Sequence, residues 1–471
     1  MRAIPDHADT IAAIATPAGP GGLGVLRLSG PRAWAIGQAL FIPRRAWPAG
    51  GPRPWRLRLG RVVEPGPGGE TIDEALAAFF RAPHSYTSQD CVELSLHGGP
   101  ALLLRALQAS LAQGCRLARP GEFTLRAFLG GRLDLAQAEA VAGLIAAQGR
   151  GEARLAYAAL AGGLGERLAP LRAALVSAAA TVEAGIDFPE DVAPAEGLAL
   201  ARTLAEEVAR PLAGLLADSR KRRVFRAGAA VVICGRPNVG KSSLFNAILG
   251  RGRALISQWA GTTRDCIEES FLLGGAAVRL TDTAGLGAGV ESAGPAAGLD
   301  ALGRAAAREA LDRADLLLVV LDGSQALSAE DRAVLDETAG QPRLIAINKA
   351  DLGAAWDLSD LPAEAGPALR VSAKSGVGLT GFLERLAGLV TGGEPEPAPG
   401  EVLAGDRQAE ALERVLQAAT RAAGHLGADA PAPELASLDL AEALSALGEV
   451  DGLGAPEEVF EAVFSQFCVG K

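Results

Sequence analysis

The chain has 471 residues, of which 49% are hydrophobic, and this length predicts two to four domains with sizeable cores. Its formal net charge of -10 argues against broad, non-specific nucleic-acid binding but leaves room for a local basic site. The five cysteines lie far apart with no CxxC pair, which is typical of a reducing cytoplasm, and the N-terminus shows no signal peptide. No apolar stretch looks long enough to span a bilayer, so we expect a cytoplasmic protein without membrane insertion.

Four segments follow one another along the chain. Residues 1–122 alternate short apolar runs with Gly/Pro turns and predict a small α+β domain. Residues 123–225 carry Ala, Leu, Glu and Arg at helical spacing, whereas residues 226–390 alternate strands with helices. Residues 391–471 begin with a Pro/Gly/Glu-rich linker and then return to helical composition. We therefore expect a multidomain α/β plus α fold, in which a Ras-like P-loop domain is inserted into a helical domain.

A phosphate-binding loop follows the apolar run at residues 229–234. The sequence Gly235-Arg-Pro-Asn-Val-Gly-Lys-Ser242 matches GxxxxGK[ST], and helical residues 243–249 come next. Strand, loop and helix in this order are the context that the motif requires. Lys241 would reach the β- and γ-phosphates and Ser242 would bind Mg²⁺, while backbone N–H groups and the helix N-terminus hold phosphate. The nucleotide-binding residues predicted here are Asn238, Val239, Gly240, Lys241, Ser242 and Ser243.

Further motifs complete a GTP site. Thr263, in the segment at residues 261–265, is the better candidate for the Mg²⁺ shell, and Asp282 would hold Mg²⁺ through water. Asp351 of Asn348-Lys-Ala-Asp351 selects guanine, because its carboxylate accepts from N1–H and N2–H₂ and adenine offers no such donor pair. Each motif stands at a strand end, where open α/β sheets bind ligands. The residues predicted from these motifs are Thr262, Thr263, Asp282, Thr283, Ala284, Gly285, Asn348, Lys349, Asp351, Ser372, Ala373 and Lys374.

The position just after DxxG holds Leu286, where many small GTPases carry a glutamine that orients the attacking water. An aliphatic side chain cannot orient water, so another group must act there. A monovalent cation is one possibility, with the Asn238 side-chain oxygen close to it; the alternative is that Asn238 is only a turn residue.

The sequence resembles the tRNA modification GTPase family MnmE (also called TrmE) over essentially the whole chain. The resemblance is carried by the opening at residues 15–30, by the segments 93–100, 118–124 and 132–140, and by the terminal Phe467-Cys-Val-Gly-Lys471. It implies a homodimer whose G domains meet across a potassium ion, and a heterotetramer with the FAD-containing protein MnmG (GidA). It also implies a tRNA substrate that receives an aminomethyl-type (carboxymethylaminomethyl) group at C5 of the wobble uridine, using a one-carbon unit carried by a tetrahydrofolate derivative.

The same resemblance implies roles for individual residues. Potassium would be bound by Asn238, Thr262 and the backbone of Ser257 and Trp259, and Mg²⁺ by Ser242 and Thr263. The folate would lie against Arg27, Glu93, Arg132 and Lys471. Phe467 and Val469 are apolar residues that are unusual for a free chain end, and they predict a tail docked on the N-terminal domain with Lys471 near Arg27 and Arg132. Asp300 corresponds to the acid that positions water, with Glu291 as its rival, and Cys468 is either catalytic or a small buried apolar residue.

Two other functions share the G motifs. One is a ribosome-assembly GTPase that acts as an RNA-binding switch, and the other is a regulatory GTPase scaffold. The first usually carries a basic RNA-binding module, whereas the C-terminal region here is helical and acidic. His97 is expected in a core or turn, and the basic run at residues 220–223 is expected in a solvated linker or against tRNA phosphate.

Overall fold

The protein divides into two compact units. A computed structural model describes residues 8–66, 68–187, 194–251, 253–254, 267–282, 308–454, 456–465 and 467–470. The first unit comprises Met1–Ala142, Leu160–Arg210 and Asp406–Lys471, and the second comprises Gly143–Ala159 and Pro211–Gly405. The four domain ranges expected from the sequence remain a proposal beside this division.

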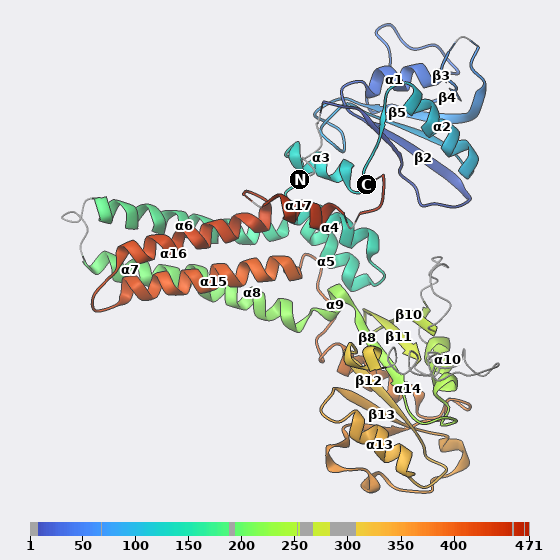
Figure 1. Ribbon diagram of the computed structural model, residues 1–471, viewed down its shortest axis with the longest axis vertical. Coiled ribbons are helices and arrows are strands. Elements are labelled where there is room, and N and C mark those ends of the chain that lie inside the picture. The colour runs from blue at the N-terminus through green and yellow to red at the C-terminus, as the bar shows by residue number, and fades with distance from the viewer. Residues whose placement is uncertain are drawn as a thin grey trace, which may run out of the picture. The chain divides into compact units, whose positions relative to one another are not determined.

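The first unit begins with a seven-stranded sheet in the order β3-β4-β5-β6-β2-β1-β7 (Figure 1). Its strands are β1 (Ile11–Ile14), β2 (Gly21–Ser29), β3 (Phe41–Pro43), β4 (Arg58–Val63), β5 (Thr71–Phe80), β6 (Cys91–Gly98) and β7 (Arg116–Leu117). Alternate residues of β2 and β6, such as Leu26 and Leu94, join the core with helices α1 (Ala33–Leu40) and α2 (Pro100–Ala112). The residues between them, Arg27 and Glu93, therefore lie on the opposite face of the sheet.

Helix α3 (Glu122–Leu129) packs on that opposite face. Its Phe123 is fully buried in a cluster with Ile11 and Ala13 of β1. The other helices of this unit are most of α4 (Leu135–Ala146), α6 (Gly163–Asp187), α7 (Pro194–Thr203), η1 (Leu204–Ala209), α15 (Asp406–Gly427), α16 (Pro433–Asp451) and α17 (Glu457–Phe464).

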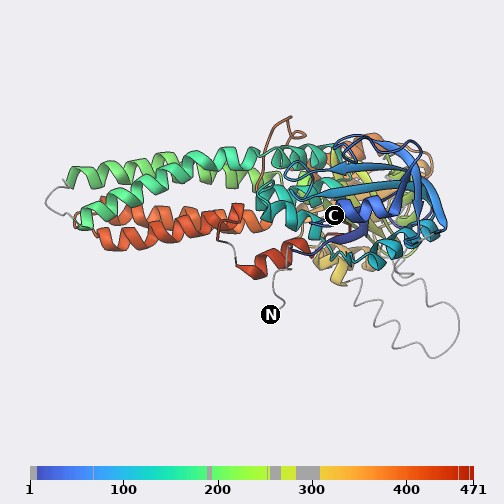
Figure 2. The same ribbon diagram turned by 90° about the horizontal axis from the view of Figure 1, so that it is seen from above.

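Helices that precede the second unit's sheet in sequence and helices that follow it form one bundle in the first unit. Helix α16 packs against both α15 and α6, and α15 also packs against α7 and η1 (Figure 2). Arg407 of α15 makes a two-point ion pair with Glu139 of α4, with N–O distances of 2.6 and 3.0 Å. The predicted helical domain, interrupted in sequence by an α/β insertion, is confirmed.

Helix α6 corrects one expectation. Among the described residues it is the one helix that is long and apolar enough, by length and composition alone, to cross a membrane. The statement that no apolar stretch reaches this length was wrong, because alanine raises the hydropathy of a helix without forming a conspicuous apolar run. Its buried residues, including Leu168, Leu171 and Leu175, are spaced three and four apart, as in a helix that packs within a bundle.

The second unit contains a seven-stranded sheet in the order β14-β13-β12-β8-β11-β10-β9. Its strands are β8 (Ala229–Cys234), β9 (Arg253–Ala254), β10 (Ile267–Leu273), β11 (Ala276–Asp282), β12 (Leu316–Asp322), β13 (Arg343–Asn348) and β14 (Ala368–Arg370). The five strands β8, β11, β12, β13 and β14 are parallel, and β10 is antiparallel to β11 and to β9. The carboxyl ends of the five parallel strands therefore share one edge.

Helices cover both faces of this second sheet. Phe245 of α10 (Lys241–Arg251) and Phe382 of α14 (Leu379–Val390) are buried against one face, and Leu335 of α13 (Ala329–Glu337) is buried against the other. Strand β12 is buried at every position, which explains its apolar run from Leu316 to Leu321; only its last residue, Asp322, is polar. The unit also holds α5 (Arg150–Leu160), most of α8 (Arg210–Lys221) and α9 (Val224–Ala227).

Candidate nucleotide and N-terminal sites

The predicted phosphate loop joins β8 directly to the start of α10. Gly240 has φ of +96°, and a Cβ there would lie 2.3 Å from Nδ2 of Asn348, so only glycine fits. Asn238 has φ of +63°, a left-handed conformation that asparagine tolerates better than most residues. The prediction of a strand, a loop and a helix in this order is confirmed.

Lys241 is buried and its side chain is folded back into the loop. Its Nζ donates hydrogen bonds of 2.9 Å to the Gly235 carbonyl and 3.0 Å to the Arg236 carbonyl. Burial lowers the pKa of this ammonium group. The loop thus already surrounds a cation with carbonyl oxygens, and phosphate oxygens are a natural further partner for it.

Ser242 and Asp282 come together from different elements. Ser242 Oγ, in the first turn of α10, donates a 2.9 Å hydrogen bond to Oδ2 of Asp282, the last residue of β11. Asp282 is 1% exposed. A hydroxyl beside a buried carboxylate is the donor set that Mg²⁺ takes in nucleotide sites, so these two residues fit the predicted metal.

The guanine motif is fastened to the phosphate loop. Asn348 Nδ2 donates to the Val239 carbonyl at 2.9 Å, and Asn348 Oδ1 accepts from the Ala373 N–H at 3.0 Å. Lys349 Nζ donates to the Asn238 carbonyl at 2.9 Å. One amide side chain thereby links the phosphate loop, the Asn348–Asp351 motif and the Ser372–Lys374 motif.

Asp351 stands exposed at the same edge. Ser372 Oγ donates a 2.6 Å hydrogen bond to its Oδ1 and, as the largest contribution, lowers the pKa of the carboxyl group. The carboxylate keeps acceptor capacity for the two guanine donors.

Part of the predicted site lies outside the described residues. The residues concerned belong to the predicted potassium and Mg²⁺ sites, to the motif after Asp282, to the two candidate acids and to the chain end. They are Ser257, Trp259, Thr262, Thr263, Thr283, Ala284, Gly285, Leu286, Glu291, Asp300 and Lys471. Their roles stay predictions.

A cavity of about 520 Å³ lies in the N-terminal domain. Its lining includes Arg27, Glu93 and Arg132, three of the four residues that the resemblance assigned to folate. Arg27 Nε and Nη2 are each 2.8 Å from Glu93 Oε1. Arg132 Nη1 donates to the Tyr86 carbonyl at 2.7 Å.

Tyr86 is a residue of this cavity that the sequence reasoning missed. The guanidinium carbons of Arg27 and Arg132 lie 5.2 and 5.0 Å from its ring centroid, and its hydroxyl is 2.9 Å from Thr124 Oγ1. The ring thus holds two cations at the cavity by cation–π attraction. Nothing in the spacing of Tyr86 signals this, since its partners lie 38 or more positions away.

The C-terminal tail is docked beside this cavity. Phe467 is buried against Phe464, and Val469 forms an antiparallel bridge with Pro120. The Gly470 carbonyl accepts from Arg27 Nη1 at 3.5 Å, and a Cβ on Gly470, at φ of +100°, would lie 2.3 Å from the Ile14 carbonyl oxygen. Cys468 is exposed, so its alternative reading as a small buried residue is wrong.

The structure corrects one further prediction and refines another. His97 lies exposed on β6 with Nδ1 3.0 Å from Asp73, rather than in a core or turn. The run at residues 220–223 spans the end of α8 and the approach to α9. Arg220, Lys221 and Arg223 are exposed, as expected of a solvated run, whereas Arg222 is paired with Glu394 and Glu401. Local charge and composition do not reveal such distant partners. The contact with tRNA phosphate stays a prediction.

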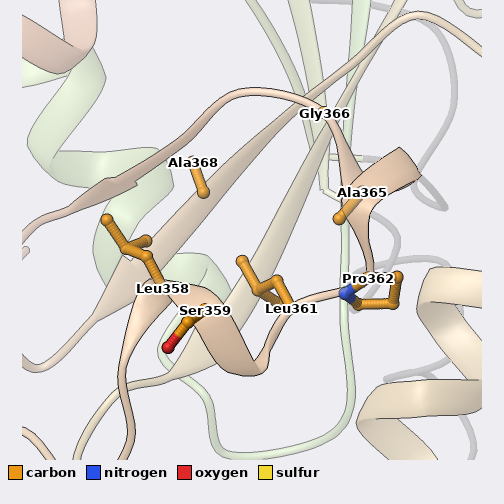
Figure 3. A pocket seen from close by; sticks show the side chains of 7 residues that line it. All are labelled: Leu358, Ser359, Leu361, Pro362, Ala365, Gly366 and Ala368. Atoms are coloured by element: carbon orange, nitrogen blue, oxygen red, sulfur yellow. The ribbon is translucent and has the colours of Figure 1, made fainter.

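A further pocket of about 620 Å³ lies at the edge strand β14 (Figure 3). It is lined by Leu358, Ser359, Leu361, Pro362, Ala365, Gly366 and Ala368, and it contains none of the predicted site residues. Within the described ranges, no three His, Cys, Asp or Glu residues gather as a metal cluster would require.

Taken together, the phosphate loop and the guanine motif at one sheet edge define a P-loop GTPase domain, here combined with an α+β domain and a helical bundle. The profile "MnmE helical domain" matches residues 135–468, and "GTP-binding protein TrmE N-terminus" matches residues 10–132. The chain belongs to the MnmE (TrmE) family of tRNA modification GTPases.

Several curated relatives share nearly the full length. The tRNA modification GTPase MnmE of Heliobacterium modesticaldum is 42% identical over 98% of this chain and 99% of that protein, and that of Symbiobacterium thermophilum is 43% identical over the same shares. Among solved structures, the G domain of the T. maritima FeoB iron transporter matches 34% of this chain and 98% of that chain at 25% identity, with a TM-score of 0.26. That partial likeness says nothing about function.

Proposed function

We propose that this GTPase installs an aminomethyl-type (carboxymethylaminomethyl) group on C5 of the wobble uridine of certain tRNAs. It would work in the cytoplasm as a homodimer, joined by the FAD-containing protein MnmG in a heterotetramer. The observation that carries the proposal is the Gly470 carbonyl on Arg27, because it brings the terminal signature to the cavity of the N-terminal domain. A tail that served only as a frayed end would have no reason to be held there.

The cavity fits a tetrahydrofolate derivative by its chemistry. Arg27 and Arg132 supply cationic donors for an anionic ligand, and Glu93 supplies acceptors for ring N–H groups. Burial raises the pKa of the Cys91 thiol at the cavity wall to about 12, so this thiol stays neutral and offers no nucleophile. The folate, when bound, would supply the one-carbon unit.

The GTP site would need two metal ions. Mg²⁺ would be held by Ser242 and Thr263, with Asp282 acting through water, and potassium by Asn238, Thr262 and the backbone of Ser257 and Trp259. The ions would supply positive charge to the phosphates in the transition state. Lys241 would bind the β- and γ-phosphates, and Asp351 would orient the guanine.

The ribosome-assembly alternative gains no support from the fold. Described residues 406–454, 456–465 and 467–470 form α15, α16, α17 and the docked tail, and no sheet-containing RNA-binding module occurs among them.

A reconstituted reaction tests the proposed chemistry. Purified protein, the FAD-containing partner, GTP, unmodified tRNA and a tetrahydrofolate labelled with ¹³C in its one-carbon unit are incubated together. Mass spectrometry should find the label on the wobble uridine with the unchanged protein, and none with Arg132→Ala. The matched control is Arg105→Ala, because Arg105 is a surface arginine paired with Glu64 and Glu70 in the same domain. A wobble uridine that is modified without ¹³C would contradict the folate assignment.

A further inference from the structure

A buried carboxylate, Asp322, stands at the carboxyl end of β12, next to the nucleotide motifs but outside all of them. It is 3% exposed. Its Oδ2 lies 2.7 Å from Lys349 Nζ, while its Oδ1 accepts from the N–H and the hydroxyl of Ser324 at 2.9 and 2.6 Å. Burial works to raise the pKa of Asp322, but its bonds to Lys349 and Ser324 outweigh this and hold the pKa below the ordinary value. Asp322 is therefore an anion that holds Lys349 in one place.

Lys349 transmits this hold to the phosphate loop. The same Nζ donates to the Asn238 carbonyl at 2.9 Å, and both Lys349 and Asn238 have φ of +63°. Left-handed backbone at a residue with a side chain persists only where its surroundings enforce it. The Asp322–Lys349 pair is such an enforcing contact at the carbonyl of Asn238.

Arg236 fixes the other side of the loop. Its Nε lies 3.0 and 3.1 Å from the two carboxylate oxygens of Asp331, which is 2% exposed in the capping box of α13. Its Nη2 is 3.3 Å from Gln325 Oε1 and 4.0 Å from Asp322 Oδ2. Two sets of contacts thus hold the loop. One runs from Asp322 at the end of β12 through Lys349, and the other runs from Asp331 of α13 to Arg236.

We propose that Asp322 and Arg236 are positioning residues of the GTPase, which hold the phosphate loop in its binding conformation without touching the nucleotide. The loop would otherwise relax at Asn238 and lose alignment of its backbone donors with the phosphates. This claim rests on GTP binding by the family. Because Asn238 is also a proposed potassium ligand, we expect the same contacts to support potassium binding, and this second claim rests on the proposed function. The consequence is that nucleotide affinity depends on a carboxylate outside all nucleotide motifs.

The test compares charge-neutral variants in the full-length protein. Asp322→Asn keeps the shape, and its matched control is Asp315→Asn, because Asp315 precedes the same strand and its Oδ2 accepts from the Ala230 N–H. GDP affinity is measured by calorimetry, and the midpoint of thermal unfolding is measured with and without GDP. We expect Asp322→Asn to weaken GDP binding about tenfold and to shrink the GDP-induced rise of the midpoint. Asp315→Asn should lower the thermal midpoints with and without GDP by similar amounts, so that the GDP-induced rise is kept, with GDP affinity within about twofold.

A second pair keeps the proposal testable if Asp322→Asn fails to fold. Arg236→Lys keeps the charge but loses the planar fork, and Arg332→Lys on exposed α13 surface is its control. Arg236→Lys should weaken GDP binding several-fold, and combined with Asp322→Asn the losses should be less than additive. GDP affinities of Asp322→Asn and Arg236→Lys that equal those of their controls would overturn the proposal.

The claim about potassium has its own readout. The potassium concentration that gives half-maximal hydrolysis should rise in Asp322→Asn and not in Asp315→Asn. An unchanged half-maximal potassium concentration in Asp322→Asn would overturn the claim that Asp322 also supports the potassium site. If potassium fails to stimulate even the unchanged protein, the proposed cation site fails, whereas the GDP comparison still decides the positioning role.

Discussion

The hydroxyl of Ser372 donates a 2.6 Å hydrogen bond to Oδ1 of Asp351, and so joins the last nucleotide motif to the residue that we propose to select guanine. Ser372 is fully buried, whereas Asp351 is exposed. A fixed donor on one oxygen orients the carboxylate and leaves its remaining lone pairs for guanine. This bond would hold the exposed carboxylate in one orientation for base recognition.

Guanine selectivity should depend on this carboxylate. Asp351→Asn replaces an acceptor by a donor, which faces the N1–H of guanine unfavourably but matches the extra carbonyl of xanthine. We expect GTP affinity to fall by about 100-fold or more and preference to shift towards xanthine nucleotides. Competition binding with GTP, XTP and ATP measures this, and an intact protein that binds ATP as well as GTP would sink the assignment.

Hydrolysis should be stimulated by potassium and much less by sodium. The reasons are Leu286, which cannot orient water, and Asn238, whose side-chain oxygen in the phosphate loop is a candidate ligand for the cation. Steady-state rates are compared in KCl and NaCl at matched ionic strength, with choline chloride as the control for salt. Equal rates in the potassium and sodium salts count against the cation.

Asp300 is expected to position the attacking water, with Glu291 as the rival. Each lies outside the described residues, so kinetics must decide. Asp300→Ala should lower turnover at saturating GTP by about 100-fold, because general acid–base groups typically contribute rate factors of this size or more. GDP affinity should stay intact. Full turnover in Asp300→Ala together with loss in Glu291→Ala would transfer the role to Glu291.

A buried charge network should make the N-terminal domain sensitive to acid. Glu122 and Arg126 are each 1% exposed in their side chains and pair at 3.0 Å, and Arg116 lies 2.6 Å from Glu122. Burial raises the pKa of Glu122, but these arginines outweigh it and hold its pKa below the ordinary value. Its contribution is therefore fully present above the ordinary pKa and is lost as the pH falls through the lowered one.

Removing that charge should be costly. Glu122→Gln removes one of the two carboxylates paired with buried Arg126, the other being Asp9. We expect a loss of about 2 kcal/mol in the free energy of unfolding, measured by urea denaturation at pH 7. The control is Glu70→Gln, an exposed partner of Arg105 at 3.0 Å, which should cost under about 1 kcal/mol. Similar losses in the two variants would show that the network does not stabilise the domain.

Deleting residues 467–471 should separate the two activities. The tail lies in the first unit and the phosphate loop in the second, so GTP hydrolysis should largely survive. Calorimetric binding of a tetrahydrofolate should be lost, because Arg27 loses its contact with Gly470 and Lys471 is removed. A Phe467→Ala variant shows whether loosening the docked tail is enough. Undiminished folate binding by the truncated protein would leave the tail a purely packing role.

The sequence predicted the G domain well because its signals are local. The apolar run at residues 229–234 coincides with the bounds of strand β8. Buried parallel strands are continuous apolar runs, and the loops after them carry fixed glycines and polar residues at fixed spacing. The docking of the tail was also expected, since its apolar residues are unusual for a free end.

Other features depended on partners that no local pattern reveals. Tyr86 takes its place from Arg27, Thr124 and Arg132, and Asp322 from Lys349, all distant in sequence. The pairing of Arg222 was missed for the same reason, since Glu394 and Glu401 are distant in sequence. The apolar helix α6 was missed for a local reason, the many alanines noted above. Long-range contacts turn a single aromatic or acidic residue into part of a site.

Mass analysis of wobble nucleosides tests the central claim most directly. tRNA is isolated from a strain that lacks the gene and from the same strain carrying the intact gene, Lys241→Ala, the deletion of residues 467–471, or the Arg105→Ala control. We predict that the strain lacking the gene contains no carboxymethylaminomethyl-type group at the wobble uridine, that the intact gene and Arg105→Ala restore it, and that Lys241→Ala and the truncation do not. Normal wobble modification in the strain lacking the gene would contradict the account.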